Sequence, residues 1–225
     1  MSGVEVSEAR KACGWTQVEL ARKLGLSQGY VSLMESNGRV VPRRLALKLV
    51  SLLGLSASKL PVSSQTEPLS SNRAAGALST LGYPGFAHLG KRYRLNPAEL
   101  LVRTLSRKNV EARLVEALPW VVLHFPHLDW PWLLSNAKQN DLQNRLGFVV
   151  MVARELAERW SDSTTAETLR KWEGALEPSR LQKEDAFAGD TLTEVERRWL
   201  RTNRSAEAAH WNLLSNVSAD TLARA

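Results

Sequence analysis

The chain has 225 residues, of which 44% are hydrophobic and 24% are charged, so its composition is that of a globular protein rather than a disordered one. Its length fits one large domain or two small ones. The single cysteine, Cys13, excludes an intramolecular disulfide framework and indicates a reducing cytoplasm. The first residues lack the basic start and apolar core of a signal peptide, and no apolar run is long enough to span a membrane.

The formal net charge of +7 is unevenly distributed along the chain. Residues 1–62 hold nine Lys and Arg against four Asp and Glu, whereas the remainder holds twenty-one against nineteen. The excess of positive charge therefore lies in the first part of the chain. Such an excess is compatible with a nucleic-acid partner but does not by itself demonstrate one.

Residues 5–13 are predicted to form a first helix. Its candidate inward positions are Val6, Ala9 and Ala12, which recur at helical spacing. Cys13, on the same helix, is expected to be a small buried hydrophobe rather than a redox switch.

Two further short helices are predicted over residues 16–24 and 27–35. Thr16 and Glu19 have the spacing of a capping box at the start of the first of them. Gly25 is expected to end that helix in a left-handed conformation, so the two helices should be joined by a tight turn.

The spacing within these two helices is that of a helix-turn-helix. Ala21 is a small residue that lets the helices approach, Gly25 makes the turn, and Val31 is placed to lock the second helix against the first. The stretch TQVELARKLGLSQGYVSLMES resembles the helix-turn-helix of the Cro/cI-type (Xre) DNA-binding regulators, and the resemblance covers about residues 5–60.

In a helix-turn-helix the second helix enters the major groove with its first residues facing the base edges. Gln28 is the best base reader there because its amide can make two hydrogen bonds to adenine, and Leu33 could cover a thymine methyl. Gln17 is expected to contact a phosphate, as are several residues around and after the second helix. The predicted DNA-binding residues are Gln17, Ser27, Gln28, Gly29, Tyr30, Ser32, Leu33, Asn37, Arg39, Arg43 and Arg44.

A further helix is predicted to start near Pro42 and to end at Gly54, with leucines along one side. The following stretch, PVSSQTEPLSSN, is rich in serine and proline and has no periodic apolar pattern, which is typical of a linker. The sequence therefore predicts three parts: a helix-turn-helix DNA-binding domain over 1–61, a linker over 62–72, and a helical domain for dimerisation or partner binding over 73–225.

The second domain is predicted to be helical throughout. Asn96 and Pro97 make a strong helix start, and residues 110–125 predict another helix that Pro119 should kink or divide. Residues 141–160 are the longest apolar helical pattern and should form the centre of the core. No strand alternation or fixed-period repeat is present, so the predicted fold class is all-α.

Seven of the eight tryptophans lie in this second domain. They are interpreted mainly as core and helix-packing residues, with an aromatic surface for a ligand or partner protein as the alternative. Trp130 and Trp132, in the motif DWPWLL, are the residues predicted to bind a partner.

No pattern in the sequence predicts catalysis. His124 and His127 flank a proline and lack the further ligands of a metal site. No nucleophile and base can be paired from sequence, so we expect no enzyme activity, no cofactor and no metal.

The sequence predicts a cytoplasmic, nucleoid-associated transcriptional regulator that binds double-stranded DNA, with a homodimer on an inverted-repeat operator. The segments DWPWLLSNAKQNDLQNRLGFVVMVARELAER and TEVERRWLRTNRSAEAAHWNLL are similar to the C-terminal regions of Xre-type regulators encoded beside toxins, including abortive-infection nucleotidyltransferases. This resemblance implies an autorepressor and antitoxin whose second domain binds a cognate toxin. The alternatives are a ligand-responsive repressor with a small-molecule site in the tryptophan-rich domain, and a helical enzyme with a DNA-targeting module.

Overall fold

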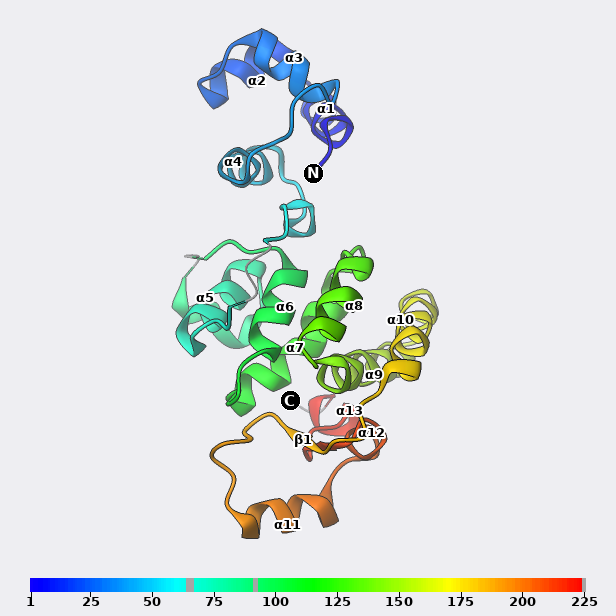
Figure 1. The fold of residues 1–225 in the computed structure, drawn as a ribbon. Helices are drawn as coiled ribbons and strands as arrows, with labels where there is room; N and C mark the ends of the chain where they lie inside the picture. The colour runs from blue at the N-terminus through cyan, green and yellow to red at the C-terminus, as the bar shows by residue number, and fades with distance from the viewer. Residues whose placement is uncertain (64–66, 91–92, 224–225) are drawn as a thin grey trace. The chain divides into compact units, whose positions relative to one another are not determined.

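The computed structural model describes residues 1–63, 67–90 and 93–223. The chain forms two compact units, shown in Figure 1. Unit 1 is made of Met1–Ser63 and Arg94–Asn96, and unit 2 of Ser64–Tyr93 and Pro97–Ala225.

The predicted linker falls where the chain leaves unit 1. Residues 64–66 of this linker lie outside the described residues, and helix α5 (Ser71–Leu81) begins at its carboxyl end. The division into residues 1–61, 62–72 and 73–225 stays a prediction.

Unit 1 is built from short helices; α2 and α3 begin at the residues expected from their capping signals, whereas the first helix begins two residues earlier than predicted, after a capping box at Ser2. Its elements are α1 (Gly3–Ala12), α2 (Gln17–Leu24), α3 (Gln28–Glu35), α4 (Arg43–Leu53) and the 3-10 helix η1 (Ala57–Lys59). Thr16 and Glu19 form the predicted capping box at the start of α2. Gly25 ends the same helix with a φ of 70°, in the left-handed region that favours glycine.

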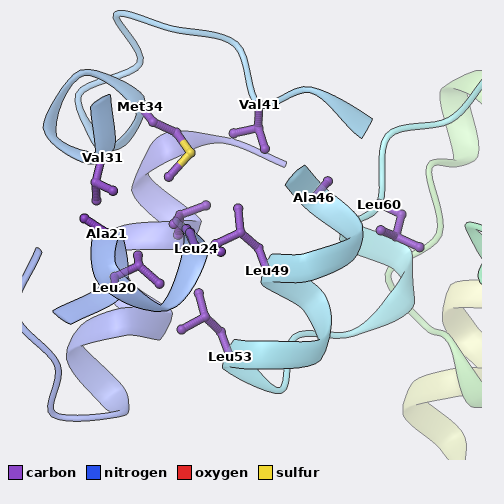
Figure 2. Close-up of a cluster of buried hydrophobic side chains, with 11 residues drawn as sticks. Leu20, Ala21, Leu24, Val31, Met34, Val41, Ala46, Leu49, Leu53 and Leu60 are labelled. Atoms are coloured by element: carbon purple, nitrogen blue, oxygen red, sulfur yellow. The ribbon is translucent and has the colours of Figure 1, made fainter. Parts of the chain in front are cut away.

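The core of unit 1 lies among these helices, and Figure 2 shows its side chains pointing toward one another. The buried apolar residues are Val6, Leu20, Ala21, Leu24, Val31, Met34, Val41, Ala46, Leu49, Leu53 and Leu60. Because α2, α3 and α4 each contribute side chains at helical spacing, the turn between α2 and α3 is fixed by packing on both sides.

The inward face of α1 differs from the prediction. Val6 is buried as expected and Ala9 partly so, but Ala12 is exposed and Arg10 is buried instead. Cys13 is also exposed, so the expectation that it is a buried hydrophobe is wrong. The physical reason is an ion pair between Arg10 and α3, which turns this side of the helix toward the core.

Unit 2 is the larger helical unit, and it confirms the all-α prediction. Its helices are α5, α6 (Pro97–Leu105), α7 (Ala112–His124), α8 (Trp130–Gln139), α9 (Gln143–Arg159), α10 (Ser163–Leu176), α11 (Glu194–Asn203), α12 (Ala206–His210) and α13 (Ala219–Leu222), with 3-10 helices η2 (Pro84–Leu89) and η3 (Glu177–Ser179). The two-residue strands β1 (Asp185–Ala186) and β2 (Leu213–Leu214) pair in parallel. Within the described ranges, no helix has the length and apolar character needed to cross a membrane.

Helix α9 is the centre of this unit, as its apolar pattern predicted. It packs against α7, α8, α10, α12 and α13, and most of its residues are buried. Gly147 lies against the buried ring of Trp211, where an added Cβ would come within 2.5 Å of ring atoms. Helix α7 runs through Pro119 without a break, so the proline does not divide it.

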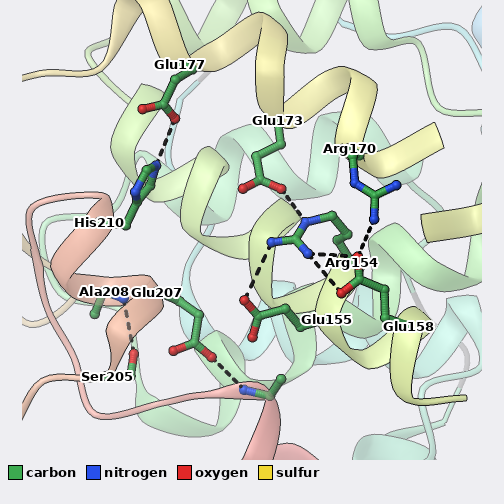
Figure 3. A network of polar contacts seen from close by, with 11 residues as sticks. Arg154, Glu155, Glu158, Arg170, Glu173, Glu177, Ser205, Glu207, Ala208 and His210 are labelled. Carbon is green, nitrogen blue, oxygen red and sulfur yellow. Dashed lines mark hydrogen bonds and ion pairs between the residues drawn. The ribbon is translucent and has the colours of Figure 1, made fainter. Parts of the chain in front are cut away.

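Polar contacts join α9 to α10, and others join α12 to η3 and α13, as Figure 3 shows. The Arg154 guanidinium lies 2.6 Å from Glu173 and 2.9 Å from Glu158. Beside it, burial and the carboxyl group of Glu207 raise the pKa of Glu155 to about 7. Glu207 is itself buried and accepts a hydrogen bond from the backbone amide of Ala219 at 3.0 Å.

Candidate nucleic-acid interface

Helix α3 presents its first turn to solvent. Ser27 is the N-cap residue, and its hydroxyl accepts a hydrogen bond from the backbone amide of Tyr30 at 3.2 Å. Val31 and Met34 are buried against the rest of unit 1. Since these residues fix the inner side of α3, the side chain of Gln28 lies on the outer side, where it is exposed.

A hydrogen bond between two glutamines connects α3 to the start of α2. The Nε2 atom of Gln28 donates to Oε1 of Gln17 at 2.8 Å. The amide of Gln28 keeps a second N–H and its carbonyl oxygen for other partners. These two groups are the donor and acceptor that a bidentate contact with adenine uses, so the bond to Gln17 orients Gln28 without consuming this capacity.

Gln17 is in turn held from inside the unit. Its Nε2 atom donates to Oε2 of Glu35 at 3.0 Å. Glu35 receives two further hydrogen bonds from Arg10, at 2.6 and 2.9 Å, and Arg10 also donates to the backbone carbonyl of Trp15 at 2.6 Å. A continuous chain of hydrogen bonds therefore runs from the buried ion pair to the exposed amide of Gln28.

The ion pair at the base of this chain is almost fully buried, with 9% of the Arg10 side chain and 5% of the Glu35 side chain exposed. Burial by itself raises the pKa of Glu35, but the hydrogen bonds from Arg10 and Gln17 outweigh it and hold the pKa below its ordinary value. Sequence reasoning missed both residues. The only signal was a pair of charged residues at positions that the helical periodicity places next to the core.

The other predicted base-facing residues on α3 differ in their exposure. Leu33 is 54% exposed, although most leucines of unit 1 are at least partly buried, so an apolar group is available on this surface. Ser32 is half-buried. An added Cβ at Gly29 would meet nothing within 4 Å, so any need for glycine there would come from a bound molecule and not from the fold.

The predicted phosphate-binding residues divide into two groups. Arg39 is exposed and its guanidinium lies 4.5 Å from the centre of the Tyr30 ring, and Arg44 is also exposed. Arg43, by contrast, is half-buried and donates to the carbonyl of Pro61 at 3.0 Å. Asn37, with a φ of 58°, accepts a hydrogen bond from the backbone of α1, so its side chain also stabilises the unit.

The two tryptophans predicted to bind a partner lie on α8 of unit 2. Trp130 is 4% exposed and stacks on Trp172, with ring centres 5.2 Å apart and planes 12° from parallel. This placement fits the packing interpretation. Trp132 is half-buried, so it is the member of the pair that a partner could reach.

The two histidines that flank Pro126 make other contacts or face solvent. His124 stacks on Trp120, with ring centres 4.4 Å apart, and His127 is exposed. In the part of the chain that the structure describes, no three His, Cys, Asp or Glu side chains come together as a metal site.

Residues 6–60 match the family model described as helix-turn-helix, a span that covers the capped helices, the core and the glutamine pair of unit 1. No curated protein and no solved structure shows significant similarity to the chain. The amino-terminal part of this protein is therefore a helix-turn-helix DNA-binding domain, and the protein is a DNA-binding transcriptional regulator.

Proposed function

We propose that the protein is a sequence-specific repressor that acts in the cytoplasm as a homodimer on an inverted repeat near its own gene. A single helix-turn-helix module contacts only a few base pairs, which is too little for high specificity. Two modules related by a two-fold axis would read two half-sites about one helical turn apart.

The observation that carries this proposal is the exposed amide of Gln28, held by Gln17 above the buried pair of Arg10 and Glu35. A flexible surface glutamine would have to lose its freedom on binding DNA, whereas this one is already oriented. Arg39 and Arg44 add exposed positive charge for phosphates on either strand.

The test is DNA binding by the full chain, measured by fluorescence anisotropy on DNA from upstream of its own gene and on a shuffled sequence. Gln28→Ala should weaken binding to the upstream DNA by about tenfold, since a bidentate base contact contributes about 1–3 kcal/mol, and should leave binding to the shuffled DNA unchanged. Gln139→Ala, which changes an exposed glutamine on α8, is the matched control. An equal loss on both DNAs would contradict base reading by Gln28.

For unit 2 we propose that it binds and neutralises a toxin encoded beside the gene, so that the protein is both autorepressor and antitoxin. The support is the similarity of its two segments to the C-terminal regions of regulators that neighbour toxins, together with the half-buried Trp132. Co-expression with the neighbouring gene product should yield a complex that co-purifies. A neighbouring product that never co-purifies would contradict the antitoxin role while leaving the repressor proposal intact.

A small-molecule effector is the second candidate. A cavity of about 550 Å³ in unit 2 is lined by residues that include Arg107, Arg145 and Asp185. Arg145 and Asp185 form an ion pair at 2.6 Å, so charged groups line this cavity, and its lining contains no tryptophan. A metabolite that raises the melting temperature and releases the upstream DNA would favour this candidate over the antitoxin.

A further inference from the structure

Two neighbouring hollows lie on unit 1 between the end of α2 and helix α4. Their volumes are about 460 and 230 Å³, and Leu24 and Lys48 line both of them. Along α4 they extend from Arg44 to Leu52, which corresponds to about 12 Å of helix axis. Because the two hollows share lining residues, they form one continuous depression, which we call the α2–α4 groove.

The floor of the α2–α4 groove is apolar. It is formed by leucines that pack against the core of unit 1, the core that Figure 2 shows. Three of them, Leu45, Leu47 and Leu52, are only half-buried. Covering these leucines with an apolar group of a partner would remove their remaining apolar surface from water, which is favourable.

The rim of the groove is positively charged. Among the described residues that line it there is no aspartate or glutamate. Glu19, one turn before Lys23, accepts hydrogen bonds from Thr16 at the start of α2 instead. The groove therefore combines an apolar floor with an excess of positive charge. The basic residues of the rim, all exposed, are Lys23, Arg44, Lys48 and Arg94.

Contacts within unit 1 position two of these cations without neutralising them. The ammonium group of Lys23 lies 4.5 Å from the centre of the Trp15 ring. Arg94 belongs to the segment Arg94–Asn96 of unit 1, and its guanidinium lies 3.5 Å from the carbonyl oxygen of Leu47. Since neither the ring nor the carbonyl carries a net charge, both cations keep their charge for a partner.

We infer that the α2–α4 groove is a docking site for an acidic segment of a partner protein that also carries apolar side chains. The carboxylates of the segment face the four basic residues of the rim, and its apolar side chains cover the leucines of the floor. Two turns of a helix, or about four extended residues, are long enough to span the groove. An open groove with an exposed rim suits a segment of a protein better than a small molecule, because small-molecule sites enclose most of their ligand.

DNA is the other polyanion that unit 1 binds, but it matches the groove less well. The sugar-phosphate backbone offers charge and little apolar surface for the leucines. Lys23 also lies six residues after Gln17, about 9 Å along α2 from the residue that holds Gln28. Arg44 is the basic residue of the rim that is also predicted to contact phosphate. A docked segment should therefore compete with DNA at Arg44 and weaken DNA binding.

Fluorescence anisotropy of the full chain with labelled peptides tests the inference. The first peptide has about twelve residues, all glutamate or leucine, with leucine at helical spacing. In the second peptide serine replaces every leucine, and in the third lysine replaces every glutamate. The first should bind, the second should bind at least about tenfold more weakly, and the third should not bind. Equal binding of the first two peptides, or no binding of the first up to about 1 mM, would overturn the inference.

Charge reversals locate the binding. Lys48→Glu changes the basic residue that lines both hollows, and Lys23→Glu changes one in the larger hollow only. Each should weaken binding of the first peptide about fivefold. Lys11→Glu is the matched control, because Lys11 is an exposed lysine of unit 1 that lies outside the groove. If the groove variants bind like the wild type, or if the control loses as much affinity, the groove is not the site. Far-UV circular dichroism verifies that each variant is folded.

Binding of the shuffled DNA separates a protein partner from DNA as the occupant. Lys23→Glu should reduce this binding no more than Lys11→Glu does, and a larger loss would assign the groove to the phosphate backbone and overturn the inference. The unlabelled first peptide should release upstream DNA from the wild type, and DNA that stays bound would contradict the competition at Arg44. The peptide measurements need no DNA, so the docking site can fail while the proposed repressor stands.

Discussion

Removing Glu35 tests whether the buried ion pair supports the fold, the DNA-reading surface, or both. Glu35→Ala leaves the guanidinium of Arg10 buried, with 9% of its side chain exposed and its carboxylate partner gone. The substitution also removes the acceptor of the Gln17 side chain. The double variant Arg10→Met with Glu35→Leu removes both charges and keeps apolar volume at the same place.

The expected free-energy changes differ in size for the two variants. Breaking a buried pair from one side costs about 3–5 kcal/mol, a large part of the roughly 5–15 kcal/mol that stabilises a domain. Replacing both partners by apolar residues is neutral or stabilising in comparable cases. The double variant should therefore fold about as well as the wild type and still bind upstream DNA about fivefold more weakly, because Gln17 has lost a hydrogen bond of about 1 kcal/mol.

Amide hydrogen exchange of peptides from α2 and α3 measures the stability of unit 1 in the full chain, separately from that of unit 2. The low pKa of Glu35 adds a pH dependence: the contribution of the pair is present above about pH 4.5 and declines as the pH falls through the lower folded-state pKa. The double variant should lack this decline. The reasoning is refuted if the amides of α2 and α3 exchange as slowly in Glu35→Ala as in the wild type. It is also refuted if the double variant binds upstream DNA with wild-type affinity.

Three further predictions concern other parts of the chain. Gly147→Ala should destabilise unit 2 by about 1–3 kcal/mol, because the new Cβ would meet the ring of Trp211, and this cost exceeds the better helix propensity of alanine. Urea unfolding measures the change, and an unchanged midpoint would contradict the close approach of Gly147 to Trp211. Because burial and the neighbouring Glu207 raise the pKa of Glu155 to about 7, the folded state keeps a proton that the unfolded state has released, so stability should fall as the pH rises from about 4.5 to 7. Glu155→Gln should remove this fall in stability, and at pH 8 the variant should be more stable than the wild type by about 1–2 kcal/mol, a value reduced for partial exposure. Thermal unfolding at pH 5 and pH 8 measures this difference, and equal shifts of the melting temperature at the two pH values would contradict the prediction. Arg39→Ala should weaken binding to every DNA sequence and reduce the slope of log affinity against log salt by about one, and an identical slope would argue against phosphate contact.

Much of unit 1 could be predicted because its signals are local. The capping box at Thr16, the left-handed Gly25 and the periodic leucines each act within a few residues, and together they define the helix-turn-helix. The position of Gln28 on the outer side of α3 follows from the buried residues on its inner side. The same local reasoning correctly made α9 the centre of unit 2.

What the sequence did not reveal depends on contacts between distant residues. Arg10 meets Glu35 across 25 positions, and although helical periodicity places each of them next to the core, no local pattern indicates that the two form a pair. Arg43 was expected to be a phosphate ligand but also binds the carbonyl of Pro61, which only the path of the chain after α4 brings close. The exposure of Val195 and Trp199 on α11 likewise could not be predicted from the sequence, because their spacing is that of an ordinary packed helix.

Unit 1 is completed by Arg94–Asn96, a segment separated from the rest of the unit by thirty residues of unit 2. Asn96 is buried there, and its side-chain amide donates to the carbonyls of Ser58 and Leu60, at 3.0 and 2.6 Å. During synthesis on the ribosome, the first 63 residues therefore emerge without the side-chain donor of these two carbonyls, which becomes available only after more than thirty further residues have been added. We expect the DNA-binding domain to reach its final stability only when residue 96 is available, so that a fragment for separate study should end beyond it.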